Sequence, residues 1–192
     1  MIAENSDREA LIAQADIYRL YARIIQPALA EFGPTADIVS GEMTDIEAFL
    51  EAARANTNTE LCYEIRRDFA LIIGALFERQ LQFWLSGKIS PSAVERKRSL
   101  SALLSLVDNV DNTIVTHGIK DDLNELCLVA NVVRHGSGRS AEELESIAPR
   151  FWNHRRISPD LVGNMRIGDN DLQKYAKAVI KFWHRAGASP LP

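Results

Sequence analysis

The sequence predicts an all-α fold, a helical bundle of about six helices. Apolar residues recur at helical spacing through most of the 192 residues. Serine, threonine and proline mark the starts of these segments, and glycines mark their ends. No strand pair, phosphate-binding glycine loop, repeat or low-complexity tract interrupts the pattern. The length favours one domain over residues 1–192, with its core at about 60–185 and an N-terminal helical extension at 1–57.

Composition restricts the cellular setting and the partners. The formal net charge is −4, so any contact with nucleic acid must be local rather than spread over the surface. The acidic segment Met1–Glu9 does not resemble a signal peptide, and the apolar run Phe69–Phe77 is too short to cross a bilayer. We therefore expect a cytoplasmic protein without membrane contact. Cys62 and Cys127 lie in apolar helical patterns, which predicts buried free thiols.

The N-terminal half predicts three helices. The first runs from about Asp7 to Phe32 after the capping box Ser6-x-x-Glu9, and Pro27 should kink it. Its expected buried stripe is Leu11, Ala15, Tyr18, Ala22 and Ile25. A short helix, Asp45 to about Ala55, follows the capping box Thr44-x-x-Glu47. The longest helix, about Glu60 to Ser86, is apolar all round at its centre and should be the central helix of the bundle.

The C-terminal half predicts four more segments, with glycine stops at Gly87, Gly118, Gly136 and Gly187. The helices are expected at about Pro91–Val110 (after Ser90), Lys120–Arg134, Ala141–Pro149 (with the box Ser140-x-x-Glu143) and from Asp169 or Asn170 onward. The stripe of the last helix is Leu172, Tyr175, Ala176, Val179 and Trp183. We expect the core to contain Phe69, Ile73, Leu76, Leu128, Val132, Val179 and Phe182, and residues 153–168 to form a surface loop.

The end of the fifth helix carries the main candidate site. Asn131 is a poor helix former inside an apolar run, and His135 lies four residues further on the same face. Such a pair can bind a phosphate, and a histidine can act as a general acid or base near neutral pH. The alternative stays open that Asn131 satisfies a neighbouring carbonyl while His135 interacts with the helix dipole.

The long helix with Leu76-Phe77-Glu78-Arg79, followed by Asn131-x-x-x-His135-Gly136, resembles the HEPN superfamily. The resemblance covers roughly Glu60 to Arg185. It implies a small, usually dimeric all-helical domain, of which many are metal-independent ribonucleases of toxin–antitoxin and phage-defence systems. Asn131 and His135 match the asparagine and histidine of the catalytic signature, but Ala130 stands where the family has its catalytic arginine.

Other arginines are candidates for the missing role. Arg139 lies in the loop Gly136–Ser140, beside a helix N-terminus that offers free backbone donors to an anion. Arg134 is adjacent to His135 but points about 100° away around the helix. Arg66, Arg67 and Arg79 flank the apolar centre of the long helix, where each must face solvent, a partner or a cleft, or form a salt bridge.

The basic, aromatic segment 149–156 gives the candidate RNA-binding residues Arg150, Trp152, Arg155 and Arg156, and Arg134 near the end of the fifth helix is a further candidate. In the alternative, Phe151 and Trp152 anchor the loop into the core. His117 and His184 are expected as dipole partners at helix C-termini. No set of side chains has metal-ligand spacing, and no cofactor is expected.

Three function classes remain in competition, the third being a small-molecule enzyme that uses His135. The first is an HEPN-like RNA-directed protein of a defence or toxin-related system, either a weak, atypical ribonuclease or a binder. The second is a non-catalytic helical module that binds or regulates a toxin or defence effector. The resemblance implies a homodimer joined at the ends of the fifth helix, and the wide apolar surface of that helix favours the same assembly.

Overall fold

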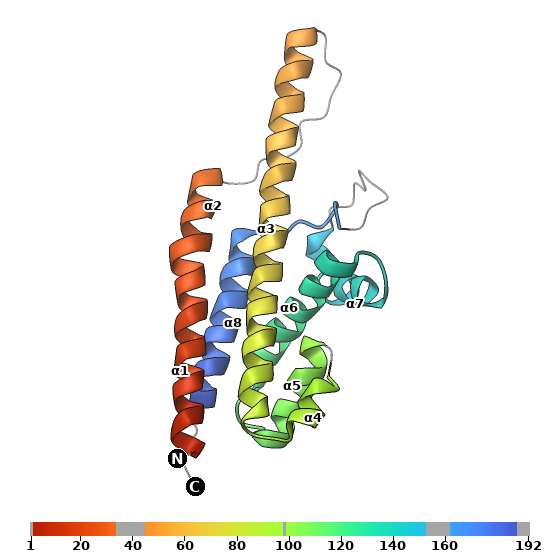
Figure 1. Cartoon of the computed structure of the whole chain (residues 1–192). Helices are drawn as coiled ribbons and strands as arrows, with labels where there is room; N and C mark the ends of the chain where they lie inside the picture. The colour runs from red at the N-terminus through yellow and green to blue at the C-terminus, as the bar shows by residue number, and fades with distance from the viewer. Residues whose placement is uncertain (1, 34–44, 98, 153–161, 188–192) are drawn as a thin grey trace.

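The computed structural model is all-α, as the sequence predicts, and describes residues 2–33, 45–97, 99–152 and 162–187. Its elements are α1 (Ile2–Leu20), η1 (Tyr21–Ile25), α2 (Gln26–Phe32), α3 (Ile46–Ser86), α4 (Pro91–Glu95), α5 (Leu100–Val110), α6 (His117–His135), α7 (Arg139–Ile147), η2 (Pro149–Phe151) and α8 (Asp169–Gly187). Figure 1 shows α1 and α8 side by side, with α3 between them and the group α4 to α7. Over the described residues there is no strand, and one antiparallel bridge joins Trp152 to Met165. None of the described helices has the length and hydropathy to cross a membrane.

The first helical segment reaches Phe32, as predicted, but includes a π-helical turn, η1. Here the backbone N–H of Gln26 bonds to the carbonyl of Tyr21, five residues back. Pro27 follows in the first turn of α2. Because proline has no N–H to donate, a wider turn at this point relieves the helix ladder.

The predicted buried stripe of this segment was largely wrong. Of its members only Ile25 is buried, whereas Leu11 and Tyr18 are 58% and 61% exposed. The buried face is instead that of Ala10, Ala13, Ile17, Ile25 and Leu29. Small side chains on this face allow α1 to approach α8, with which it makes its most extensive contact.

A single helix, α3, replaces the two helices predicted between Asp45 and Ser86. Its N-cap is Asp45, whose carboxylate accepts from Ala48 N at 2.7 Å, in place of the expected Thr44. The polar stretch 56–59 does not end the helix, and the Thr57 hydroxyl donates within it to the carbonyl of Ala53 at 2.9 Å. Local propensity is a weak preference that the rest of a long helix overrides.

Several other boundaries differ from the predictions. The expected helix from Pro91 to Val110 is divided into α4 and α5, because Ser99 caps a new start by accepting from Ala102 N at 3.2 Å. Helix α6 begins at His117, so Gly118 is not a stop and His117 is not at a C-terminus. The serines expected to cap, Ser6 and Ser140, lie inside α1 and α7; the N-cap of α7 is Gly138. Ser90 does hold the N-cap position of α4, and α8 contains both Asp169 and Asn170.

The core lies where α3 packs against α6 and α8, as predicted. Five of the seven expected core residues are buried, while Phe69 and Leu76 are partly buried. The predicted stripe of α8 is buried throughout. Aromatic rings meet edge to face between α3 and α8, with Phe77 and Phe182 5.1 Å apart and Trp84 and Trp183 6.1 Å apart. Such contacts add to the stabilisation from apolar burial.

The apolar surface of α6 is already covered within one chain. Its residues Leu123, Leu126, Leu128, Val129, Ala130 and Val132 are all buried. Helices α3, α7 and α8 provide the cover. The excess surface that favoured a dimer through α6 is therefore absent, because the helix is buried on several sides by its own bundle.

Candidate functional site

The C-terminal end of α6 presents the two residues that the sequence singled out. Asn131 is half-buried, and His135, the last residue of the helix, is exposed. Gly136 ends the helix at φ +77°, with its N–H bonded to the carbonyl of Val132 at 2.8 Å. In the described part of the chain, neither the Asn131 nor the His135 side chain has a hydrogen bond or ion pair. Both are therefore available to a ligand.

Position 130, where the HEPN signature has an arginine, faces the interior. Ala130 is 4% exposed and packs against Gly74 of α3. A Cβ added at Gly74 would lie 2.9 Å from the Ala130 Cβ, so the two helices cross too closely for a larger side chain. Ala130 and His135 are also about 140° apart around the helix. An arginine at position 130 would reach neither solvent nor the histidine.

The nearest cationic candidates differ in their availability. Arg134 forms an ion pair with Glu78 of α3, at 3.6 Å from Nη2 to Oε2. Arg139 is exposed at the start of α7, across the short turn that follows His135. In the described residues it has no ion pair or side-chain hydrogen bond. His135 and Arg139 therefore lie at the two ends of the turn that joins α6 to α7.

Two of the other candidate arginines hold the fold together. Arg66 is 1% exposed; it donates to Asp169 Oδ1 at 2.7 Å and to the carbonyl of Gly33 at 3.1 Å. Arg67, 8% exposed, donates to the carbonyl of Met165 at 3.1 Å. Buried guanidinium groups require such partners, since an unpaired buried charge is strongly destabilising. These side chains fasten the segment before α8 to α3 and are not available to a substrate.

Arg150, an expected RNA contact, belongs to a charge cluster around the buried carboxylate of Glu125. Glu125 of α6 accepts from Arg150 Nη2 at 2.5 Å, from Lys174 Nζ at 2.6 Å and from the Tyr175 hydroxyl at 2.7 Å. Asp171 also accepts from Arg150, at 2.9 Å. Burial alone would raise the pKa of Glu125, but these three donors outweigh it and hold the pKa below its ordinary value. The cluster joins α6, η2 and α8 and gives Arg150 a structural role.

The rest of the expected RNA-binding segment does not form an exposed platform in the described structure. Trp152 is 9% exposed and meets Phe151 edge to face, with ring centroids 6.4 Å apart. A buried ring cannot stack on a base, so the alternative of a core anchor describes both aromatics. Arg155 and Arg156 lie outside the described residues.

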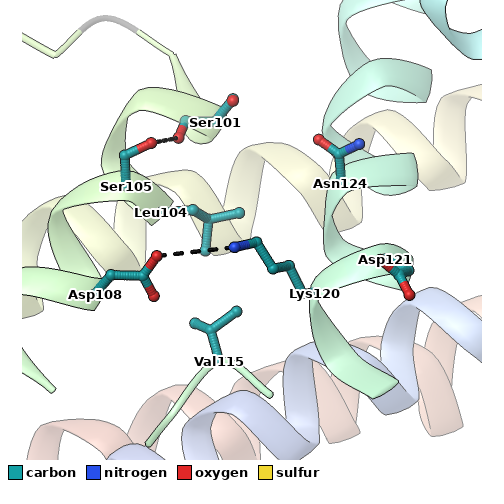
Figure 2. Close-up of a pocket in the computed structure, with 8 residues that line it drawn as sticks. All are labelled: Ser101, Leu104, Ser105, Asp108, Val115, Lys120, Asp121 and Asn124. Atoms are coloured by element: carbon teal, nitrogen blue, oxygen red, sulfur yellow. Dashed lines mark hydrogen bonds and ion pairs between the residues drawn. The ribbon is translucent and has the colours of Figure 1, made fainter. Parts of the chain in front are cut away.

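A polar pocket between α5 and α6 was not predicted from the sequence. Its volume is about 300 Å³. Figure 2 shows Lys120 and Asp108 pointing toward one another, at 4.0 Å. The pocket is lined by Ser101, Leu104, Ser105, Asp108, Val115, Lys120, Asp121 and Asn124. The only signal in the sequence was the position of Asn124 on the same helix as Asn131; the serines Ser101 and Ser105 are ordinary surface residues of α5.

The lining of this pocket offers groups that can bind a polar ligand. Its lining offers both charges and several hydrogen-bonding groups, but it contains no histidine or cysteine. The hydroxyl of Ser105 donates to the carbonyl of Ser101 at 3.1 Å and so is not activated by a base. Over the described residues, no group of three or more histidine, cysteine or acidic side chains could hold a metal ion.

Comparisons with known proteins leave the family open. No protein-family model matches the chain, and neither the curated proteins nor the solved structures gave a significant match.

Proposed function

We propose that this protein is a non-catalytic helical interaction module that binds a partner protein through the N-terminal part of α3, residues 46–61. The observation that carries the proposal is an exposed apolar face. Ile46, Phe49 and Leu50 are 68%, 57% and 49% exposed. They lie on the part of α3 that extends beyond the other helices of the bundle (Figure 1).

The spacing of these residues suits recognition by a groove. Positions i, i+3 and i+4 share one face of a helix, and such triplets are the anchors of a helix that lies in a partner's apolar groove. Charged neighbours Glu47 and Glu51, both exposed, flank the face. Large apolar side chains gathered on a projecting helix are typical of an interaction surface.

A catalytic function has less support. In the HEPN mechanism an arginine positions the phosphate beside the histidine, but Ala130 is buried at the crossing with Gly74. Arg134, which directly precedes His135 in the sequence, is paired with Glu78. From the resemblance to HEPN domains we propose that the partner is the effector of a toxin–antitoxin or phage-defence system.

The test is affinity capture from the native cells with the tagged chain and two variants. Phe49→Glu places a charge in the proposed contact and should abolish capture of the partner, because a buried unpaired carboxylate is costly. Ile147→Glu, at an apolar residue of α7 that is 48% exposed, is the matched control and should capture as the wild type does. Equal capture by all three proteins would refute the proposed surface.

A second candidate function is RNA binding or weak cleavage at the α6–α7 turn. The observation in its favour is that His135 and Arg139 are both exposed beside the N-terminus of α7, whose first backbone donors can bind a phosphate. His135→Ala should then abolish cleavage of single-stranded RNA while circular dichroism stays unchanged. RNA that stays intact and unbound with the wild-type protein removes this candidate.

A further inference from the structure

Along α3 runs an apolar stripe that the other described helices leave partly exposed. Ile72 and Phe83 are 45% and 66% exposed, and Leu61 is 48% exposed. Ile65 and Leu76 are half-buried and continue the stripe. Successive members of the set Leu61, Ile65, Ile72, Leu76 and Phe83 are alternately four and seven residues apart. It extends over about 33 Å, the rise of 22 helical residues. Figure 1 shows this length of α3 at the front of the bundle with no helix across it.

Two opposite charges are placed along the same stripe. Asp68 and Arg79 are exposed and lie on the face of Ile72, four residues before it and seven after it. In the described part of the chain neither has an ion pair or hydrogen bond. A partner that covers the stripe must therefore supply a cation near Asp68 and an anion near Arg79.

We propose that a second copy of this chain covers the stripe, with its α3 antiparallel to the first. A twofold axis passing near residues 73 and 74 lies midway between Asp68 and Arg79. Each Asp68 then faces Arg79 of the second copy, and Ile72 packs against Ala75 of the second copy. The chain thus supplies both charges that its own stripe requires, which few unrelated helices would do.

The surroundings of the stripe give this contact enough area. A groove of about 360 Å³ separates α3 from α1 and is lined in part by Ile12, Leu76 and Phe83. On the other side of the α3 ridge, Phe83 and Val94 line a second groove toward α4. If α1 contributes alongside α3, two helices about 10 Å wide over the 33 Å of the stripe have a footprint of roughly 700 Å², against the ~800 Å² per partner of a stable interface.

This contact is distinct from a dimer through the ends of α6, where the chain buries its own apolar surface. It is also separate from the face of Ile46, Phe49 and Leu50 proposed for the partner, since Leu61, the first residue of the stripe, lies 11 residues after Leu50. An antiparallel α3 pair points those two segments in opposite directions, so the dimer would present two separate partner sites. Loss of partner capture by Phe49→Glu and loss of the dimer can therefore be observed separately.

The test is charge reversal followed by sedimentation of the full chain at micromolar concentrations. The wild type should sediment at twice 21.4 kDa. Asp68→Arg and Arg79→Asp should each raise the dimer dissociation constant about tenfold or more, because each creates two like-charge contacts. An equimolar mixture of the two variants should restore a dimer, since both contacts again join opposite charges. Glu143→Arg, on the exposed face of α7, should have no effect.

Three outcomes would overturn the proposal. The first is a wild-type protein that stays monomeric at every concentration tested, up to about a hundred times the assay concentration. A weak dimer would form within that range. The second is a dimer that both charge reversals leave intact. The third is a purified complex in which a different protein, sensitive to Asp68→Arg, occupies the stripe in place of the second copy. Circular dichroism of the variants confirms folding, which changes at exposed positions should preserve.

Discussion

Gly74 of α3 faces Ala130 of α6 so closely that a Cβ built on the glycine would lie 2.9 Å from the alanine Cβ. The two helices cross with only a hydrogen atom and a methyl group between their backbones. This crossing accounts for the alanine at position 130, because no longer side chain fits there.

Gly74→Ala should therefore destabilise the protein by about 1–3 kcal/mol, although alanine is the better helix former. Its methyl group meets a rigid Cβ, so a backbone must shift. Gly118→Ala is the matched control: nothing lies within 4 Å of an added Cβ there, and a gain of about 0.5–1 kcal/mol is expected. Urea unfolding of both variants measures the difference. A Gly74→Ala variant as stable as the wild type would show that the crossing is not tight.

The free energy of unfolding should decrease in acid, because Glu125 is stabilised as a carboxylate in the folded protein. Its folded-state pKa is lowered by Arg150, Lys174 and Tyr175, which together outweigh burial. The unfolded chain then takes up the proton first as the pH drops below the ordinary value of 4.5, and the contribution is lost as the pH falls through the folded pKa. Glu125→Gln should cost about 2–3 kcal/mol at neutral pH and flatten the acid slope. Unfolding free energies between about pH 3 and 7 measure both effects, and an unchanged slope would contradict the role of the cluster.

Arg66 should be essential to the fold rather than to a substrate. Arg66→Ala removes the bonds to Asp169 and Gly33 and leaves a buried cavity, for a cost of about 3–5 kcal/mol. Arg139→Ala, at an exposed residue, should change stability by less than about 0.5 kcal/mol. Thermal unfolding compares the two variants. Similar melting temperatures would show that the Arg66 contacts contribute little.

The two thiols should differ in reactivity. Burial and the nearby charge of Glu78 raise the pKa of Cys127, so its reactive thiolate is scarce and inaccessible. Cys62 is only partly buried. A thiol reagent should give one fast and one slow phase, and Cys62→Ser should remove the fast one. Two fast phases in the wild type would mean that the core around Cys127 opens readily.

The helices and most of their inner faces could be predicted from periodicity. The α8 stripe was correct, since large apolar residues mark its one buried face. The α1 stripe was not, because the contact with α8 uses Ala10 and Ala13 while Leu11 and Tyr18 remain outside. A pattern that favours large side chains misses faces where close approach requires small ones.

The site was harder to predict than the fold. The shared face of Asn131 and His135 follows from spacing alone. The burial of Ala130 and the capture of Arg150 by Glu125 depend on contacts between segments far apart in the sequence. The sequence around Arg66 does not indicate that it is buried, because its partners Gly33 and Asp169 come from distant elements. A single sequence does not encode such pairings in any local pattern.

We propose that the chain acts through the apolar face of residues 46–61 and not through chemistry at His135. The most direct measurement is quantitative partner capture by three tagged proteins: wild type, Phe49→Glu and His135→Ala. We expect His135→Ala to retain the wild-type partner in equal amount and Phe49→Glu to lose it. Loss of the partner by His135→Ala, with capture retained by Phe49→Glu, would contradict a contact through residues 46–61.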